Sequence, residues 1–361
     1  MKSNYKRLGD YIRPVDVRNK DLSVSRLLGV SIEKRFIESI ANTIGTDMST
    51  YKIVKNGQFS YGPVTSRNGD KISIALLEED ECIISSSYSV FEIIDTDILL
   101  PQYLNLWFKR PEFDRYARFH SHGSAREIFD WEEMCNVELP IPPIYEQQKI
   151  VDAYNAIERR IELKLKINDN LEAQAFSYFI ENFEPNNKDE SMPDWKICKL
   201  SELAPVITGK KDANTTCGNG KYPFFSCSQE ILFTNDHTFN GDAVLVAGNG
   251  DFNIKWYCGE FEAYQRTYVL LPYKSYQYSF LYYVLKYHLP NAVNSARGSV
   301  ISFITKGILE NIECFIPNNE NEMLTYCEKL NAFNQAIDIN KVDIQATMRL
   351  QQALLMKLSS Y

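Results

Sequence analysis

The fold of this chain follows from a proline-rich corner and the segment after it, Leu139-Pro-Ile-Pro-Pro-Ile-Tyr-Glu-Gln-Gln-Lys-Ile-Val151. Three prolines within residues 140–143 favour an extended corner. From Tyr145 to Phe183 apolar residues recur at three-and-four spacing, and no proline or glycine lies between Glu146 and Glu184. At about 1.5 Å per residue, this pattern predicts a helix of roughly 50 Å.

The same order of features occurs twice along the chain. At an offset of 175 residues, Gly123-Ser124 falls on Gly298-Ser299, and Ile141-Pro142 falls on Ile316-Pro317. A second stretch without proline or glycine, 320–361, follows the second Ile-Pro corner. We interpret the pattern as an internal two-fold sequence repeat, in which each half ends in a long helix.

Two such helices are rarely stable alone and most simply pack on each other through their apolar stripes. Asn168, Asn340 and Lys341 interrupt the stripes. We expect these three residues to lie on a solvated face near a splayed end of the pair, rather than to form a polar pair that fixes the helix register.

A polar linker from Glu184 to Asp194 divides the chain near its middle. Each half begins in a similar way, because Leu8 matches Leu200 at an offset of 192. Short runs rich in β-branched residues, bounded by Gly, Asp and Pro, precede each long helix and predict strands, with one helix after them in each half. The predicted fold class is therefore α+β. Its parts are two mixed α/β domains, 1–142 and 186–317, and two long helices, 143–185 and 318–361.

Composition sets limits on the class of protein. The chain has 361 residues, 44% of them hydrophobic and 24% charged, as in folded proteins of about two domains. It has neither an amino-terminal apolar segment with a cleavage site nor a run of about 18 apolar residues, so we expect a cytoplasmic protein. Its eight cysteines form no C-x-x-C pair, which favours reduced, buried thiols over disulfides or zinc.

Signatures of catalysis are missing from the sequence. It contains no phosphate-binding P-loop, no H-E-x-x-H and no G-x-S-x-G motif. Gly248-Asn-Gly250 follows a predicted strand and precedes another, so we interpret it as a hairpin turn. His120 and His122 suggest a metal, but no cysteine or carboxylate stands at helix or loop spacing to complete a site. We therefore expect a polar loop there, no metal, and no catalysis by this chain.

Several motifs make the whole chain resemble the specificity subunit of type I restriction–modification systems, which are bacterial defence systems. The corner at 139–151 is similar to the family's boundary, where a recognition domain ends in Pro-Pro and its helix begins with Glu-Gln. The other motifs that carry the resemblance are Ile157, Ile161–Leu163, Ile167–Glu172, Tyr61–Pro63 with Arg67-Asn68, Ile84–Tyr88 and Leu203–Lys210. The carboxy-terminal copy, Ile316–Glu322, departs from the pattern, so the case there rests on the repeat.

The resemblance implies two target-recognition domains joined by two long helices that pack as an antiparallel coiled coil. Each domain reads half of a bipartite, asymmetric DNA site, and half-sites on one face of B-DNA lie roughly 34 Å apart. The implied partners are double-stranded DNA, two modification (methyltransferase) subunits that methylate adenine, and restriction subunits that translocate and cleave DNA. S-adenosylmethionine, ATP and Mg²⁺ would belong to those partners, with no cofactor in this chain.

Base readout needs Arg, Lys, Asn, Gln or Ser on loops, and these residue types indicate the candidate contacts. The DNA-binding candidates are Tyr61, Arg67, Asn68, Arg118, Ser124 and Arg126 in the first domain, and Lys210, Lys211, Lys255, Gln265, Arg266, Arg297 and Ser299 in the second. Thr65, Ser66, His120 and Asn294 flank these loops, and Tyr61, Trp256 and Tyr264 are candidates to stack or wedge. The Gly-Ser pairs at 123 and 298 suggest either a close approach to phosphate or a plain turn.

The net charge of −8 argues against a protein that holds DNA through a bulk positive surface. The two domains nevertheless hold 18 and 12 of the 39 basic residues. We therefore expect this chain alone to bind DNA weakly, with affinity appearing on assembly with the modification subunits. The alternative from another class is a duplicated protein-interaction scaffold with no direct DNA readout; the missing motifs disfavour a self-sufficient methyltransferase or nuclease.

Overall fold

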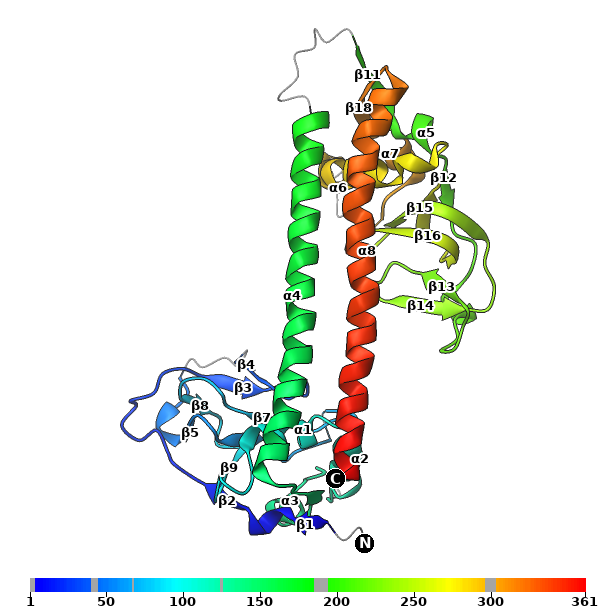
Figure 1. The fold of residues 1–361 in the computed structure, drawn as a ribbon. Helices are drawn as coiled ribbons and strands as arrows, with labels where there is room; N and C mark the ends of the chain where they lie inside the picture. The colour runs from blue at the N-terminus through cyan, green and yellow to red at the C-terminus, as the bar shows by residue number, and fades with distance from the viewer. Residues whose placement is uncertain (1–3, 40–44, 67, 124–125, 185–193, 296–302) are drawn as a thin grey trace. The chain divides into compact units, whose positions relative to one another are not determined.

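The structure is a computed structural model, and it describes residues 4–39, 45–66, 68–123, 126–184, 194–295 and 303–361 (Figure 1). The chain divides into two compact units. Unit 1 is Met1–Leu163 with Ile344–Tyr361, and unit 2 is Lys164–Asp343. Among the described residues, no helix is long and apolar enough to cross a membrane.

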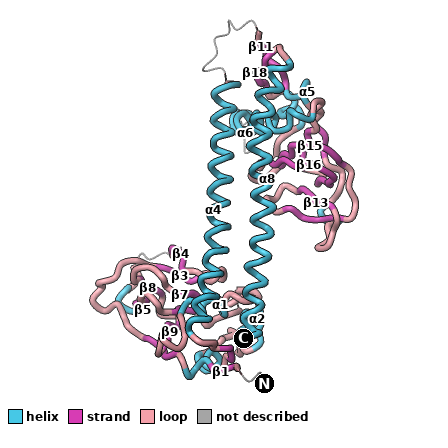
Figure 2. The backbone as a smooth tube through the Cα atoms, viewed as in Figure 1, coloured by secondary structure: helices cyan, strands magenta, loops and turns pink. Residues whose placement is uncertain are grey.

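Unit 1 contains small antiparallel sheets together with helices (Figure 2). Its main sheet has the order β2 (Ile12–Val15), β9 (Ser89–Ile93), β6 (Phe59–Tyr61) and β7 (Ile74–Leu76). The pairs are β1 (Tyr5–Arg7) with β10 (Glu138–Pro140), β3 (Leu28–Val30) with β4 (Phe36–Glu38), and β5 (Lys52–Val54) with β8 (Cys82–Ile84). The α-helices are α1 (Pro101–Phe108), α2 (Pro111–Phe119), α3 (Trp131–Cys135), the first part of α4 (Ile144–Phe183) and the last part of α8 (Glu320–Lys357). Both α1 and α2 begin at a proline, whose fixed φ suits the first helical position.

Unit 2 is built around one six-stranded sheet, covered on one side by α6 (Tyr278–Ser295). The strand order is β12 (Val206–Thr208), β17 (Thr267–Leu270), β15 (Phe239–Ala247), β16 (Ile254–Ala263), β13 (Tyr222–Phe225) and β14 (Ile231–Thr234). The remaining elements are β11 (Trp195–Lys199), β18 (Glu313–Pro317), α5 (Leu200–Leu203), α7 (Lys306–Glu310) and α8 (Glu320–Lys357), which runs on into unit 1. The predicted turn at Gly248-Asn-Gly250 lies between β15 and β16, which pair as an antiparallel hairpin.

The sheet of unit 2 curls back on itself. Along β15, Val244 and Val246 belong to the core beneath α6, whereas Ala243 and Leu245 belong to a second core inside the curl. Just beyond β16, Tyr264 bridges Lys211, which follows β12 at the opposite edge of the sheet. The curl therefore brings loops that follow distant strands together at one end of the sheet.

The sequence repeat has a structural counterpart in each unit. In unit 1 the first strand, β1, pairs with β10 just before α4, and the Leu8 N–H donates to the Val137 carbonyl at 2.7 Å. In unit 2 β11 pairs with β18 just before α8, and the Leu200 N–H donates to the Ile312 carbonyl at 2.8 Å. Both leucines are completely buried. Each unit is thus closed by the same kind of contact between its first strand and the strand that precedes its long helix.

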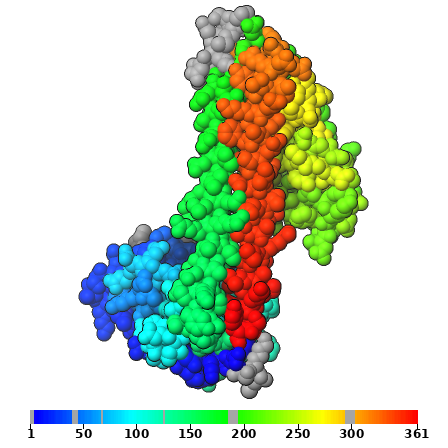
Figure 3. Space-filling view, viewed as in Figure 1, coloured from blue at the N-terminus to red at the C-terminus, as the bar shows by residue number. Residues whose placement is uncertain are grey.

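The two long helices are antiparallel in both units. In unit 2 the late α4 residue Tyr178 lies beside the early α8 residue Tyr326, with ring centroids 6.3 Å apart. In unit 1 the early α4 residues Ile150 and Tyr154 share a core with Leu355 near the end of α8. Side chains of α4 and α8 pack against each other in the space-filling view (Figure 3). The predicted antiparallel pair is confirmed; the domain boundaries at 142, 185 and 317 stay predictions.

The eight cysteines are free thiols. Cys82, Cys198, Cys314 and Cys327 are buried, whereas the other four are partly or fully exposed. The prediction of buried thiols therefore holds for half of them.

Candidate nucleic-acid interface

Four of the predicted residues of unit 2 meet where the sheet curls. The Gln265 N–H, in the turn between β16 and β17, donates to the Lys211 carbonyl at 3.0 Å. The Gly248 N–H of the β15–β16 turn donates to the Arg266 carbonyl at 2.8 Å. These bonds fix the backbone of the turn, while Lys210, Gln265 and Arg266 are exposed. A fixed backbone with exposed donor side chains is what base readout requires.

Two glycines allow this close approach. A Cβ on Gly209 would lie 2.2 Å from the Tyr264 carbonyl oxygen, and a Cβ on Gly248 would lie 2.4 Å from the Arg266 carbonyl oxygen. Neither space admits a side chain, because carbon and oxygen atoms in contact stand more than 3 Å apart. Glycine at both positions therefore permits the close approach of three segments: the one that follows β12, the β15–β16 turn and the β16–β17 turn.

Lys255 and Trp256 serve the fold rather than the open surface. The Lys255 ammonium donates to the Ser228 carbonyl at 2.7 Å and to the Asn253 side chain, and burial lowers the pKa of Lys255. The Trp256 indole donates to Asp338 on α8 at 2.8 Å, and Lys341 lies 4.1 Å from the centre of its ring. The predicted stacking by Trp256 would break these contacts.

The structure joins the two predicted clusters of unit 1. The Thr65 hydroxyl bonds to that of Ser121 at 2.9 Å, and the Thr65 N–H donates to the Glu127 carbonyl at 3.0 Å. This contact brings the loops of Asn68 and Arg126 to the end of α2, where Arg118 lies. Arg118 forms an ion pair with Glu127, and Arg126 is exposed.

Tyr61 is a correction to the sequence interpretation. It lies on β6, between β9 and β7, and its side chain is completely buried. Its ring packs edge-on against Phe91 and Phe129, and burial raises the pKa of Tyr61 to about 12. A central strand covered on both faces presents no side chain to a ligand, so Tyr61 is a core residue and does not stack on DNA in this conformation.

Several predicted residues lie outside the described residues: Arg67, Ser124, Arg297 and Ser299. Of the first Gly-Ser pair, Gly123 is described, with φ of +135°. A Cβ there would lie 2.1 Å from the Arg126 carbonyl oxygen. This position therefore requires glycine, and both alternatives for the Gly-Ser pair stay predictions.

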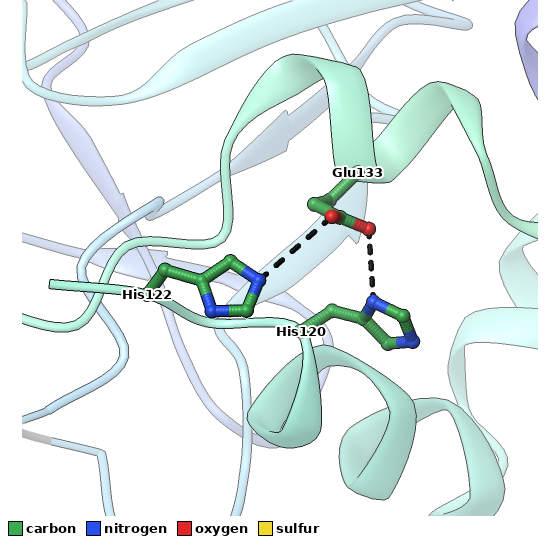
Figure 4. Close-up of side chains that lie close together, drawn as sticks. All are labelled: His120, His122 and Glu133. Carbon is green, nitrogen blue, oxygen red and sulfur yellow. Dashed lines mark ion pairs between the residues drawn. The ribbon is translucent and has the colours of Figure 1, made fainter.

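Sequence reasoning missed one cluster, formed by His120, His122 and Glu133 (Figure 4). His120 Nδ1 lies 3.0 Å from Glu133 Oε2, and His122 Nε2 lies 3.9 Å from Glu133 Oε1. Glu133 stands on α3, eleven positions after His122, so no motif spacing links it to the histidines. Only the folding of α3 against the end of α2 supplies the carboxylate that the sequence lacked.

Comparison with known protein families shows to which family the chain belongs. A family model described as "Type I restriction modification DNA specificity domain" matches twice, at residues 32–173 and 192–348. The chain belongs to this family. As a type I restriction–modification specificity subunit, it contains one copy of the specificity domain in each half of its sequence.

Curated relatives of this specificity subunit carry the same designation. The Escherichia coli type I restriction enzyme EcoDI specificity subunit is 39% identical over 166 residues, 45% of this chain and 37% of the relative. The Haemophilus influenzae HindI specificity subunit is 27% identical over 198 residues, 52% of this chain and 42% of the relative. The matches thus span less than half the length of both relatives.

Solved structures show that the fold is shared. The S subunit of a type I restriction–modification system from M. genitalium superposes with a TM-score of 0.62 at 14% identity, covering 98% of this chain and 95% of that one. A chain from a study of complex assembly and conformational transition in the type I R-M system has a TM-score of 0.50 at 19% identity, covering 98% of this chain and 96% of that one.

Proposed function

We propose that this specificity subunit recognises a bipartite, asymmetric DNA site and directs adenine methylation and DNA cleavage by partner subunits. The observation that carries the proposal is the duplicated specificity domain, each copy of which continues into one of the two long helices. One domain per half-site accounts for a split site, and two different domains account for its asymmetry.

The proposed DNA surface consists of polar side chains that the fold brings together on loops and at the end of α2. In unit 1 these are the half-buried Asn68 and the exposed Arg118 and Arg126, and in unit 2 they are the exposed Lys210, Gln265 and Arg266. Arginine pairs with guanine in the major groove, and Asn or Gln pairs with adenine. We assign Lys211 a supporting phosphate contact, in which the phosphate would replace Asp236, now 4.0 Å from its ammonium.

The acidic total of −8 determines how this subunit is expected to hold DNA. Few basic side chains project from each loop cluster, so counterion release by this chain alone is small. Two modification subunits that bind S-adenosylmethionine would add the positive surface and the methyl transfer. Restriction subunits would add ATP- and Mg²⁺-dependent translocation and cleavage, while this chain itself catalyses no step.

The test is to co-express the chain with its modification subunit and map methylated adenines in the host DNA. The expected result is one split motif, with a methylated adenine in each half. The double variant Gln265→Ala/Arg266→Ala should relax or abolish recognition of one half only. Lys196→Ala is the matched control, because Lys196 is an exposed cation of unit 2 on β11, away from these loops.

An active complex that methylates without a split motif would overturn the proposal. Binding to the modification subunit without any effect on methylation sites would instead favour a protein-interaction scaffold. A motif unchanged by the double variant would leave the specificity role intact and reject the assigned loop.

A further inference from the structure

Two imidazoles and one carboxylate converge beside the loops of unit 1. His120 caps the end of α2, His122 lies two residues further on, and Glu133 projects from α3 (Figure 4). One ligand atom from each residue can be chosen so that all three lie within 4.8 Å of one another. Three elements therefore contribute one potential ligand each.

Local contacts fix the backbone at each position. The His120 ring stacks on Tyr116, with centroids 4.2 Å apart. His122 and Ile128 exchange two backbone hydrogen bonds, of 3.0 and 2.9 Å, which hold these two residues side by side. The Glu133 N–H donates to the side chain of Asp130, the N-cap of α3, at 2.9 Å. These contacts fix the backbone at each position, so the three side chains are held in a pre-organised arrangement.

The distances suit a small transition-metal ion. Zinc binds histidine nitrogen at about 2.0–2.1 Å and carboxylate oxygen at about 2.0–2.2 Å, so neighbouring ligand atoms of a tetrahedral site stand about 3.3 Å apart. The separation of 3.0 Å between His120 Nδ1 and Glu133 Oε2 is close to that value. His122 Nε2 lies 3.9 Å from the other carboxylate oxygen, Glu133 Oε1, and the three ligand atoms as they stand are spread over as much as 4.8 Å, so His122 has to move inward to complete the set. The His122 side chain is 71% exposed and can rotate to close the difference.

We propose that His120, His122 and Glu133 bind one Zn²⁺ ion. Two histidines and one glutamate form a three-ligand set of the kind found in open zinc sites, where water completes the coordination. The exposure of the three side chains fits such an open site, because Glu133 and His120 are only 22% and 32% exposed, whereas His122 lies on the solvent side. An ion bound there would have protein ligands on one side and a coordination position open to water on the other.

The ion would act as a structural clamp. Its ligands come from the end of α2, from residue 122, which pairs with Ile128, and from α3, so binding ties the His122–Ile128 pair to two helices. Because Arg126 lies between His122 and Ile128 in the sequence, the clamp would also pre-organise a proposed DNA contact. This last step rests on the proposed function, whereas zinc binding itself does not.

The test uses the untagged full-length chain, stripped with a chelator and titrated with Zn²⁺ against a chromogenic indicator. The wild type should bind one Zn²⁺ ion at this site with an affinity about tenfold or more above that of either His122→Ala or Glu133→Gln, because each variant removes one of the three ligands. Comparing variants isolates this ion from Zn²⁺ held by exposed thiols such as Cys258. Co²⁺ substitution should give visible d–d bands in the wild type that both variants lose.

A matched control is His237→Ala in unit 2, because His237 also pairs with a glutamate, Glu260 at 3.6 Å, but the described residues offer no third ligand there. It should bind Zn²⁺ and gain thermal stability with Zn²⁺ as the wild type does. Circular dichroism of the metal-free proteins checks that the variants fold. We expect both to fold, because His122 is exposed and glutamine has nearly the same shape as Glu133.

Equal Zn²⁺ stoichiometry and affinity in the wild type, His122→Ala and Glu133→Gln would overturn the site and leave a hydrogen-bonded His-Glu-His cluster. The methylation map of the same variants distinguishes the two proposals. If the methylated motif is split but no zinc binds at this cluster, only the zinc site is rejected. If zinc binds at the cluster but the methylated motif is not split, only the proposed DNA recognition is rejected.

Discussion

Asn340 on α8 donates from its Nδ2 to the Oδ1 of Asn168 on α4 at 2.9 Å. The Oδ1 of Asn340 in turn accepts from the Lys164 ammonium at 2.9 Å, and Lys164 pairs with Asp343 at 3.0 Å. The sequence interpretation of Asn168 and Asn340 as a solvated face was wrong, because the two half-buried amides meet between the helices. A polar pair between apolar stripes penalises any shift of one helix along the other.

The asparagine contact should be measurable as a coupling energy. In a double-mutant cycle of Asn168→Ala and Asn340→Ala, we expect a coupling of about 0.5–1.5 kcal/mol in the free energy of unfolding, since each single change leaves a half-buried amide without its partner. Urea denaturation followed by circular dichroism measures it. Asn168→Ala with Glu328→Ala, an exposed position on α8, is the control pair and should show none.

Glu172 on α4 should make unit 2 sensitive to acid. Burial raises the pKa of Glu172, but hydrogen bonds from Lys286 and from the Tyr282 hydroxyl, at 2.7 Å, together with the Lys286 charge, outweigh it and lower the pKa below the ordinary 4.5. A depressed carboxyl pKa contributes stability above the unfolded-state value, and this stability is lost as the pH falls through the folded-state value.

The variant Glu172→Gln should therefore be less stable than the wild type by about 1 kcal/mol at pH 7.5, a value reduced for the partial exposure of the pair. The difference should shrink as the pH falls below the ordinary 4.5. Chemical denaturation at several pH values measures it. Glu181→Gln, an exposed position on the same helix, should show little difference at any pH; a constant deficit for Glu172→Gln across the range would contradict the assignment.

Tyr61 separates a core role from a DNA-contact role. Replacing a completely buried aromatic side chain leaves a cavity, so Tyr61→Ala should lower the free energy of unfolding by about 3–5 kcal/mol. Tyr145→Ala, at a position 57% exposed, should cost less than about 1 kcal/mol. Thermal and urea melts of the free chain check both; a stable, well-folded Tyr61→Ala protein would return this residue to the list of candidate DNA contacts.

Gly209 tests whether the curl of unit 2 positions the recognition loops. In Gly209→Ala the new methyl group meets the carbonyl oxygens of Tyr264 and Ala263, at 2.2 and 2.4 Å, so the loops must separate at a cost of about 1–3 kcal/mol. Hydrogen exchange at the Gln265 N–H should accelerate because its bond to Lys211 is strained. Gly218→Ala is the control, since nothing lies within 4 Å of its Cβ position, and it should leave this exchange rate unchanged.

Much of the architecture was predictable because its signals are local. The corner at 139–151 and the proline-free stretch after it predict a helix, and α4 runs from Ile144 to Phe183. Gly248-Asn-Gly250 predicts a hairpin turn, and β15 and β16 pair on either side of it. The match of Leu8 with Leu200 anticipates the strand contact that closes each unit. Proline geometry, glycine turns and side-chain periodicity act within a few residues, so a single sequence carries them.

The candidate sites depend on contacts that local signals do not encode. Tyr61 has the composition of a stacking residue, but a central strand position decides its burial. Glu133 joins His120 and His122 only because α3 folds against the end of α2, and Gln265 meets Lys211 only because a sheet curls. By itself, the sequence determined the repeat, the two helices and the family resemblance. The tertiary structure decided which polar groups meet, because packing of whole faces, rather than spacing along the chain, sets the distance between residues far apart in sequence.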